Sequence, residues 1–363
     1  MDPLTVAIDV GPLHGHRTGV GQAVAHLLSA LESRDDVATM PFLTSFRARP
    51  ARGERRLPLP AALAARMWAR ADVPRVDRWL GPAHVVHGTN YVAPPSRLPT
   101  VVSVYDCWSL AHPGDATPAV RRASSVLRRA VGRGAHVHVS SHATARVARE
   151  LLETDRVHVV HLGPIDPPSA APRPIAELAG RRFVLALGTL ERRKNVPSLV
   201  RAFARLAGDD QQLRLVLAGA PGDDSGRVAD AIAALPSGPA ERVHRTGPVD
   251  DAAKAWLLRH AGVLAYPSLD EGFGFPILEA QAAGTPVVAP DVGSIAEVGG
   301  AGIDLVSSAS DADLAAGLGD VLNGPATRDR LVAAGHANLA RFSWEDTAAG
   351  IVALYRQIVE EHR

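Results

Sequence analysis

The chain has 363 residues, 46% hydrophobic and 21% charged, a composition typical of a globular protein long enough for two domains. Its 39 Lys and Arg against 38 Asp and Glu argue against a dedicated nucleic-acid-binding protein, which usually carries a large basic excess. A single cysteine, Cys107, excludes an internal disulfide framework and favours a reducing, cytoplasmic compartment. No apolar run reaches the roughly 18 residues of a transmembrane helix, and the N-terminus lacks the basic leader of a signal peptide.

Short β-branched runs alternate with helical stretches along both halves, which predicts an α/β fold with parallel sheets. Strands are expected at 4–10, 83–87, 100–106, 135–140, 157–162, 183–187, 213–218, 243–246, 263–266, 286–289 and 303–306. Helices are expected at 22–31, 196–207, 250–260, 277–283 and 344–362. The pattern indicates two Rossmann-like domains facing a cleft, with ligands bound beyond the carboxyl ends of the strands.

A proline-rich stretch marks the boundary between the two halves. Five prolines fall between Gly163 and Pro174, as expected of an extended linker. The first 178 residues hold 21 arginines and 15 acidic residues, a net charge of +6, and the remainder has a net charge of −5. We therefore predict an N-terminal domain over residues 1–165 and a C-terminal domain over residues 166–344, with different partners.

The strongest functional signal is the string from Asp270 to Glu279, which follows the strand expected at 263–266. Pro276 suits the first turn of a helix, whose N-terminal amides bind anions. The amides concerned are those of Phe273, Gly274 and Phe275. Glu271 and Glu279 are carboxylates suited to accepting hydrogen bonds from hydroxyl groups. A ligand that joins phosphate to a polyol, such as a sugar nucleotide, meets both demands. The alternative for an isolated pair of glutamates is an acidic loop with a helix-capping residue.

A second signal, from Gly188 to Asn195, directly follows the strand expected at 183–187. Arg193 and Lys194 are adjacent cations in a loop that opens a helix. They can address two oxygens of a diphosphate, Arg193 through its planar fork and Lys194 as a point charge. Taken alone, the string could equally be a solvated basic turn.

A third signal is a glycine loop at Gly19 and Gly21, after the first strand and before the helix expected at 22–31. Such a loop can offer amides to phosphate, although a plain glycine-rich turn is the alternative. As a dinucleotide-binding fingerprint it is weak, because eight residues separate it from Val10. A dehydrogenase is therefore disfavoured.

Together these strings resemble the retaining glycosyltransferases of family 4, whose GT-B fold consists of two Rossmann-like domains. Residues 271–279 are similar to the E-x7-E motif of that family, and residues 188–195 to its G-x4-RKN signature. Gly19-Val20-Gly21 is similar to its N-terminal glycine loop. The strings at 87–90 and 342–344 add to the resemblance, which covers nearly the whole chain.

The resemblance implies a role for each matching position. Arg193 and Lys194 would hold the donor diphosphate and stabilise the leaving group, and Glu279 would bind the ribose. Glu271 and the amides of Phe273, Gly274 and Phe275 would bind the hydroxyls of the donor sugar. Gly19 and Gly21 would lie at the phosphates, and Gly188 belongs to the signature loop. Val249 would line the base pocket. The resemblance also implies catalysis without a metal, and a terminal helix at 345–363 that packs back on the first domain.

One position departs from the family pattern. After the strand expected at 100–106 the family usually carries His-Asp, and this chain has Tyr105-Asp106. Tyr105 can form hydrogen bonds but cannot become a cation near neutral pH. Either the donor sugar differs from the common ones, or the role is redistributed, or the enzyme is weakened. Asp106 is a candidate to orient the acceptor or to take its proton.

No residues are arranged as metal ligands usually are. The D-x-D pattern at 311–313 follows Ser310 and predicts a capped helix N-terminus rather than a metal site. His136 and His138 alternate on a strand without further ligands nearby in sequence. Cys107 is expected to be a small buried residue, because no base is paired with it.

The N-terminal half, which binds the acceptor in this fold, gives the least information about its ligand. The arginine-rich stretch at 47–56 is expected to be a mobile loop. A helical stretch further on carries Arg121, Arg122, Arg128, Arg129 and Arg133. Contact with anionic lipid or with a phosphorylated acceptor is one interpretation of these arginines, and a solvated surface is the other.

The sequence therefore predicts a retaining glycosyltransferase that moves a sugar from a GDP-, UDP- or dTDP-sugar to a hydroxyl acceptor. The acceptor would be a glycan, a lipid-linked sugar or a small metabolite, and no cofactor is expected beyond the nucleotide-sugar co-substrate. The expected location is the cytoplasm, with peripheral contact at the inner face of the membrane left open. The alternatives are a nucleotide-sugar epimerase or phosphorylase of the same fold, and a nucleotide-sugar-binding protein that has lost activity.

Overall fold

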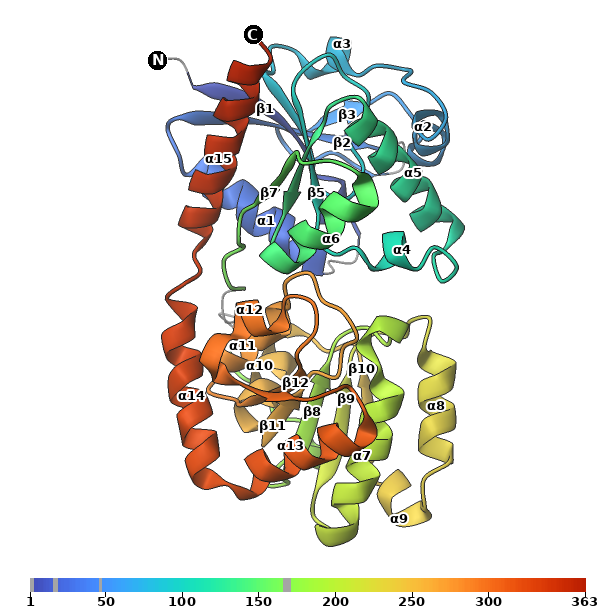
Figure 1. Ribbon diagram of the computed structural model, residues 1–363, viewed down its shortest axis with the longest axis vertical. Coiled ribbons are helices and arrows are strands. Elements are labelled where there is room, and N and C mark those ends of the chain that lie inside the picture. The colour runs from blue at the N-terminus through green and yellow to red at the C-terminus, as the bar shows by residue number, and fades with distance from the viewer. Residues whose placement is uncertain (1–2, 16–18, 46–47, 166–170) are drawn as a thin grey trace. The chain divides into compact units, whose positions relative to one another are not determined.

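The computed structural model describes residues 3–15, 19–45, 48–165 and 171–363. The chain divides into two compact units. Unit 1 is Met1–Gly163 together with Phe342–Arg363, and unit 2 is Pro164–Arg341. Unit 1 is thus assembled from two separate pieces of the sequence. In each unit a central sheet is covered by helices on both faces (Figure 1).

Seven parallel strands form the sheet of unit 1, in the order β3-β2-β1-β4-β5-β6-β7. They are β1 (Leu4–Asp9), β2 (Val37–Thr44), β3 (Arg55–Leu57), β4 (Val85–Gly88), β5 (Thr100–Val104), β6 (His136–Val139) and β7 (Val157–Val159). Their carboxyl ends lie along one edge of the sheet, because parallel strands all run in the same direction. Asp9, Thr89 and Asp106 therefore lie at this edge.

The helices of unit 1 cover both faces of its sheet. They are α1 (Gly19–Glu32), α2 (Ala61–Trp68), α3 (Asp77–Leu80), α4 (Trp108–Ala111), α5 (Pro118–Gly132), α6 (His142–Leu152) and the C-terminal α15 (Trp344–Glu361), with a 3-10 turn at Gly11–Leu13. On one face, Val6 and Ile8 pack with α1 and α15. On the other face, Ala7 packs against α2 and α3. The alternation of side chains along β1 thus supplies two hydrophobic cores.

Six parallel strands form the sheet of unit 2, in the order β10-β9-β8-β11-β12-β13. They are β8 (Phe183–Leu187), β9 (Arg214–Ala218), β10 (Val243–Gly247), β11 (Val263–Ala265), β12 (Val287–Pro290) and β13 (Ile303–Val306). The helices are α7 (Val196–Asp209), α8 (Ser225–Ala233), α9 (Ser237–Ala240), α10 (Asp251–His260), α11 (Phe275–Ala282), α12 (Ile295–Gly299), α13 (Asp311–Asn323) and α14 (Pro325–Leu339), with 3-10 turns at Ala176–Leu178, Arg192–Lys194 and Gly300–Gly302.

Several helices begin at a side-chain cap. The side chains of Thr117, Asp250, Ser310 and Ser343 each accept a hydrogen bond from an amide in the first turn of α5, α10, α13 and α15. The prediction for residues 311–313 is confirmed, since Ser310 caps α13 by accepting from the amide of Asp313. Within the described ranges, no helix is both long enough and apolar enough to span a bilayer.

Each expected strand is present, with ends displaced by at most three residues. Two strands were not predicted, β2 and β3. Pro41 interrupts the apolar pattern of β2, and β3 is a three-residue edge strand that contains two arginines. The expectation of a mobile loop over 47–56 is therefore wrong at the end of this stretch, where Arg55 and Arg56 pair with β2. The first residue of the stretch, Arg47, lies outside the described residues.

A chain of buried hydrogen bonds crosses the interior of unit 1. The hydroxyl of Tyr355 on α15 lies 2.6 Å from Nδ1 of His87 on β4, and Nε2 of His87 lies 2.8 Å from Oγ of Ser103 on β5. Oγ of Ser103 lies 2.9 Å from Nδ1 of His138 on β6, whose Nε2 lies 3.1 Å from the carbonyl oxygen of Val160. Because a carbonyl only accepts, the proton of a neutral His138 sits on Nε2. Every donor before it then points in the same direction, from Tyr355 to Val160.

His87 and His138, the two histidines in this series of hydrogen bonds, are both neutral. Burial lowers the pKa of His87 to about 3, and the proximity of His138 adds to the effect. Burial likewise lowers the pKa of His138 to about 4, although its hydrogen bond to the Val160 carbonyl works in the opposite direction. The interior of unit 1 therefore excludes protons that an unfolded chain would bind.

We expect acidification to destabilise unit 1. A histidine whose folded pKa is depressed contributes stability that is complete above its unfolded pKa of about 6.5, and that is lost by about 1.4 kcal/mol per pH unit as the pH falls towards the folded pKa. His138→Gln removes one of these groups. Between about pH 6 and 5 the variant should therefore lose about 1 kcal/mol less free energy of unfolding than the wild type loses.

Urea unfolding measured at several pH values tests this expectation. Tryptophan fluorescence reports mainly on unit 1, which contains four of the five tryptophans. His362→Gln, at the exposed end of the chain, is the matched control. An unchanged pH dependence in His138→Gln would contradict the prediction.

Candidate active site

Two loops meet at the carboxyl edge of the sheet of unit 2. The first, Gly188–Asn195, follows β8, and the second, Ser268–Gly274, follows β11. These strands are direct neighbours in the sheet, although about 75 residues separate them in sequence. Their adjacency brings the two motifs of the sequence analysis together.

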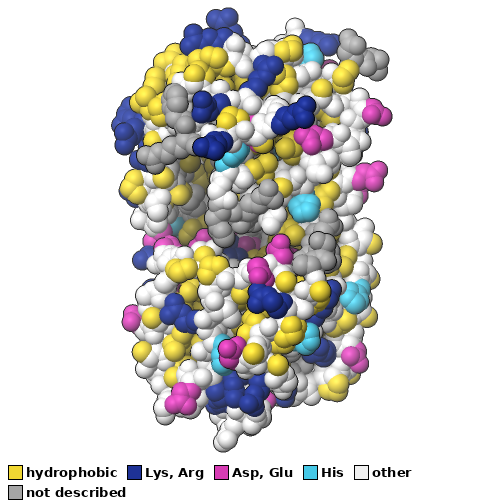
Figure 2. Space-filling view, turned by 180° about the vertical axis from the view of Figure 1, so that it is seen from behind, with side chains coloured by type: hydrophobic (Ala, Val, Ile, Leu, Met, Phe, Trp, Pro, Cys, Tyr) yellow, Lys and Arg dark blue, Asp and Glu magenta, His cyan; other side chains and the backbone are white. Residues whose placement is uncertain are grey.

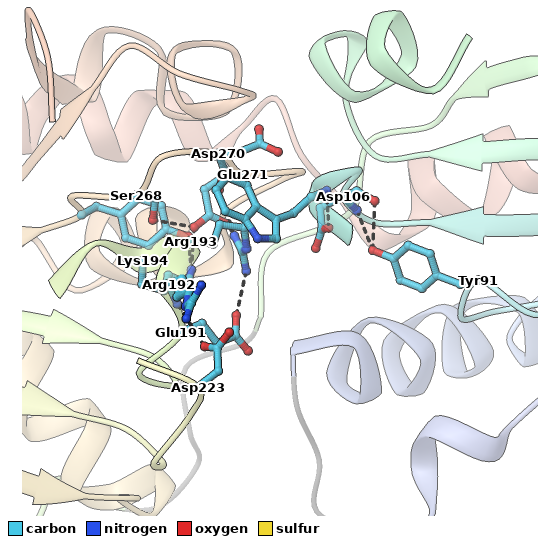
Figure 3. Close-up of polar contacts among 12 residues, drawn as sticks. Tyr91, Asp106, Glu191, Arg192, Arg193, Lys194, Asp223, Ser268, Asp270 and Glu271 are labelled. Carbon is cyan, nitrogen blue, oxygen red and sulfur yellow. Dashed lines mark hydrogen bonds and ion pairs between the residues drawn. The ribbon is translucent and has the colours of Figure 1, made fainter. Parts of the chain in front are cut away.

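The side chains of Arg193 and Lys194 converge on the carboxylate of Glu271 (Figure 3). Nζ of Lys194 lies 2.6 Å from Oε1 of Glu271 and 3.0 Å from the hydroxyl of Tyr266. A guanidinium nitrogen of Arg193 lies 2.6 Å from Oε2 of Glu271. Ser268 completes the arrangement by donating from Oγ to Oε1 at 2.6 Å. Each carboxylate oxygen of Glu271 thus faces one cation.

This cluster is shielded from water. The side chains of Arg193, Lys194 and Glu271 are only 13%, 15% and 6% exposed. Burial by itself would raise the pKa of Glu271, but the charges of Arg193 and Lys194 and the hydrogen bonds from Lys194 and Ser268 outweigh it and hold the pKa at about 2. Glu271 is therefore ionised at every physiological pH, and one carboxylate faces two cations.

The backbone holds Arg193 in place. Its carbonyl accepts from the amide of Leu269, and its guanidinium donates to the carbonyl of Asp270 at 3.0 Å. Gly188, at the end of β8, has a φ of 136°, which favours glycine, and the loop after β9 passes so close that a Cβ on Gly219 would meet the Gly188 carbonyl. The loop after β8 therefore contacts the loop after β11 on one side and the loop after β9 on the other.

Helix α11 begins beside the cluster. Gly274 precedes its first residue with a φ of 98°, and Phe275 and Pro276 form its start, as expected from the sequence. Phe273 is buried and packs edge-to-face against Phe275, and its carbonyl accepts from Oγ of Ser294. The amides at this helix start carry the positive end of the helix dipole.

Glu279 has a partner that the sequence analysis missed. Its Oε1 lies 2.6 Å from Nζ of Lys254 on α10, and this pair is 9% and 18% exposed. Lys254 comes five residues after Val249, which packs against the hydrophobic core that α10 and α11 form with the sheet of unit 2. A signal was available, because the chain has only two lysines among 37 arginines. Both lysines, Lys194 and Lys254, pair with a glutamate of the E-x7-E string.

The other predicted site residues belong to unit 1. Gly19 and Gly21 are already helical, because α1 begins at Gly19 and not at residue 22 as expected, while residues 16–18 lie outside the description. Their amides thus belong to a helix N-terminus rather than to a loop. Tyr105 and Asp106 directly follow β5. Cys107 is buried at 4% exposure, which confirms its structural interpretation.

Tyr105 takes part in the polar interior of unit 1. Burial raises the pKa of its hydroxyl well above the usual range, although a hydrogen bond with Ser103 acts in the opposite direction. Tyr105 is therefore a neutral group next to the hydrogen-bond chain of His87. It supplies no positive charge at this edge of the sheet.

Most arginines singled out on α5 are engaged within unit 1. Arg129 and Arg133 both pair with Asp72, at 3.0 and 2.8 Å. Arg128 donates to the carbonyl of Leu151, and Arg121 to that of Ala116. On the face seen in Figure 2, the basic side chains of unit 1 form separate patches with hydrophobic and neutral surface between them. These contacts favour the interpretation as an ordinary solvated surface.

Comparison with known proteins defines the class of protein. Residues 171–337 match the family described as Glycosyl transferases group 1. Sucrose-phosphate synthase from Thermosynechococcus elongatus has the same fold, with a TM-score of 0.74 at 20% identity over 99% of this chain and 100% of that one. Anabaena Alr3699/HepE, solved in complex with UDP and glucose, superimposes with a TM-score of 0.69 at 18% identity over 99% of both chains. The fold is GT-B, with two Rossmann-like units.

The sequence relatives agree with this class. D-inositol 3-phosphate glycosyltransferase of Nocardia farcinica is 36% identical over 235 residues, which is 58% of this chain. The chain spans about half the length of this curated relative, 51%. The matched family range lies entirely within unit 2. This match agrees with the family predicted from the motifs.

The geometry of the site makes a prediction for Glu271→Gln. Without the carboxylate, Arg193 and Lys194 are left as shielded like charges, so unit 2 should lose about 3 kcal/mol of stability. Inorganic pyrophosphate should restore part of this loss by replacing the missing negative charge. It should therefore raise the melting temperature of Glu271→Gln more than that of the wild type.

Thermal unfolding with and without pyrophosphate measures both effects. Ser268→Ala, which removes one hydrogen bond to Glu271 but leaves both ion pairs, is the control and should respond like the wild type. A smaller pyrophosphate effect in Glu271→Gln than in the wild type would show that the carboxylate is not the counter-ion of these cations.

Proposed function

We propose that the protein is a retaining glycosyltransferase that transfers a sugar from a nucleoside diphosphate sugar to a hydroxyl acceptor. The observation that carries this proposal is the pair of shielded cations, Arg193 and Lys194, whose side chains converge at the edge of the sheet where ligands of α/β folds bind. The match of residues 171–337 to the Glycosyl transferases group 1 family supports it.

The proposed chemistry uses these cations on the leaving group. When the bond from the anomeric carbon to the diphosphate oxygen breaks, negative charge grows on the diphosphate. Fixed cations in a shielded site stabilise this charge most where it develops, because no solvent has to reorganise. Arg193 and Lys194 take this role, and the start of α11 adds the positive end of its dipole. Two side-chain cations supply the charge that a divalent metal supplies elsewhere, so we propose metal-independent transfer.

Glu271 acts as the counter-ion of the cations before the donor arrives. Both of its oxygens already face cations, and Ser268 also donates to Oε1, so a donor sugar hydroxyl would be accepted at Oε2. We assign Glu279 to the ribose hydroxyls, and Lys254, whose Nζ donates to it, is its positioning residue. The complex of Alr3699/HepE with UDP and glucose, a protein of the same fold, supports a nucleotide and a sugar as ligands.

Two other activities would use the same donor site. A nucleotide-sugar epimerase inverts one stereocentre of the sugar and yields another nucleotide sugar, so it has no net release of nucleotide. A phosphorylase transfers the sugar to or from phosphate. Tyr105, which is neutral where the family usually has a histidine, favours a third possibility, a protein that binds the donor without turnover. Nucleotide release measured with and without an acceptor panel separates all of these from transfer.

Arg193→Ala and Lys194→Ala should each lower the rate of transfer by a factor of about 100 to 1,000, because each removes one stabilising charge from the leaving group. The rate is measured as nucleoside diphosphate released in the presence of acceptor. Arg192→Ala, an exposed neighbour in the same turn, is the control and should keep most of the activity. Undiminished turnover in both variants would exclude the proposed leaving-group role.

The stereochemical outcome is a separate prediction. We expect the transferred sugar to keep the anomeric configuration that it has in the donor. Proton NMR of the first product formed, through the coupling constant of the anomeric proton, distinguishes this result from inversion. A product of opposite configuration would disprove the retaining mechanism while leaving sugar transfer intact.

A further inference from the structure

Trp108 is a large aromatic residue that lies outside the core of unit 1. It begins α4, directly after the carboxyl end of β5. Its neighbours Cys107 and Leu110 are buried in the core that α5 and α6 cover, whereas Trp108 is half-buried and belongs to none of the core clusters formed by the described residues. An indole kept partly exposed at the ligand-binding edge of a sheet is available for contact with a ligand.

The orientation of the Trp108 ring is fixed from one side. The imidazole of His112 stacks on it with ring centroids 3.9 Å apart and an interplanar angle of 27°. Nδ1 of His112 lies 3.2 Å from the Trp108 carbonyl oxygen, which ties the two residues together across one turn of chain. His112 covers one face of the indole, so a ligand would stack on the opposite face.

Asp106 lies two residues before Trp108 and is held by Tyr91. The Tyr91 hydroxyl accepts from the Asp106 amide at 2.9 Å and donates to the Asp106 carbonyl at 3.1 Å (Figure 3). Tyr91 itself has a φ of 56°, a backbone conformation that costs a non-glycine residue roughly 1 kcal/mol or more and is kept only when its surroundings enforce it. Its amide bonds to the Ser103 carbonyl on β5. This strained residue fixes the position of Asp106.

Among the described residues, only one oxygen of the Asp106 carboxylate accepts a hydrogen bond. Oδ1 accepts from the amide of Trp108 at 3.0 Å, which joins the two residues in one turn. Asp106 is half-buried. One carboxylate oxygen anchors the turn, and the other can accept from a ligand beside the indole face.

We propose that Asp106 and Trp108 form the binding site for a sugar ring of the acceptor. A pyranose has hydroxyl groups around its rim and a face of C–H groups. The indole suits the C–H face, and an ionised carboxylate suits the hydroxyls. This inference rests on the proposed function, because it takes the bound ring to be the acceptor. It assigns the acceptor to molecules that carry a sugar ring.

The indole N–H signals in a nitrogen-15-labelled full-length protein test the binding site directly. The chain has five tryptophans, and Trp108→Phe identifies the signal of Trp108. The probes are the methyl glycosides of mannose, glucose, galactose and N-acetylglucosamine, with glycerol as a hydroxyl compound that lacks a ring. We expect at least one glycoside to shift the Trp108 signal while glycerol does not. No shift with any glycoside would overturn the proposal.

Kinetics with a glycoside acceptor supply the second test. Trp108→Ala and Asp106→Asn should each raise the KM for the acceptor roughly tenfold, the amount expected from one lost ring contact or one lost charged hydrogen bond. Trp79→Phe is the matched control, because Trp79 is equally half-buried in unit 1 but is already covered by the guanidinium of Arg78. An acceptor KM unchanged in both test variants would overturn the proposal.

Failure of this inference differs from failure of the proposed function. Calorimetry of donor binding is run on the same preparations, and Trp108→Ala should bind the donor as the wild type does. If the wild type binds the donor and transfers sugar while Trp108 responds to no glycoside, the acceptor site is wrong and the function stands. If no nucleotide sugar binds, the proposed function fails, whatever Trp108 does.

Discussion

The structure of unit 2 depends on one electrostatic constraint: two cations and one carboxylate share a space that water barely enters. Arg193 and Lys194 come from the loop after β8, and Glu271 comes from the loop after β11. Removing charges from water is costly, so the two buried cations need the carboxylate as a counter-ion and the buried carboxylate needs the cations. The cluster therefore fixes the conformation of both loops and keeps the cations in position without a bound anion. A diphosphate would enter a site that is already arranged, which lowers the reorganisation needed for binding and for leaving-group stabilisation.

The sequence was sufficient for those parts of the fold that repeat a local pattern. Buried parallel strands read as apolar runs, and caps such as Ser310 identify the helix starts. The pattern failed where tertiary contacts decide the structure. Strand β2 tolerates Pro41, and β3 exists only because it pairs with the outer edge of β2. Helix α1 starts at Gly19 despite the low helix propensity of glycine, because the following residues Ala23, Val24 and Leu27 pack into the core.

For the site, the motifs identified the loops but not their mutual contacts. Arg193, Lys194 and Glu271 were each assigned to the donor, whereas the structure shows that they are also partners of one another. This pairing follows from β8 and β11 being neighbours, which is a property of strand order and not of spacing along the chain. Lys254 was missed for the same reason, because α10 and α11 are adjacent in space and the salt bridge to Glu279 has no short-range signature. The scarcity of lysine was the one sequence feature that could have revealed it.

The two units place different demands on their polar residues. Unit 2 shields charges of opposite sign, which suits a ligand with a constant charged part. Unit 1 keeps its interior neutral, with His87 and His138 uncharged in a one-directional chain of hydrogen bonds that joins α15 to β4, β5 and β6 and ends just after β7. A rigid, neutral support of this kind suits recognition by shape and hydroxyl placement rather than by charge. The family match lies within unit 2, so the features that distinguish this chain from its relatives are to be sought at the edge of unit 1, where Tyr91 clamps the backbone of Asp106 beside a half-buried tryptophan. Under the proposed function, selectivity for the acceptor would change through a few residues after β5 without disturbing the charge cluster of unit 2.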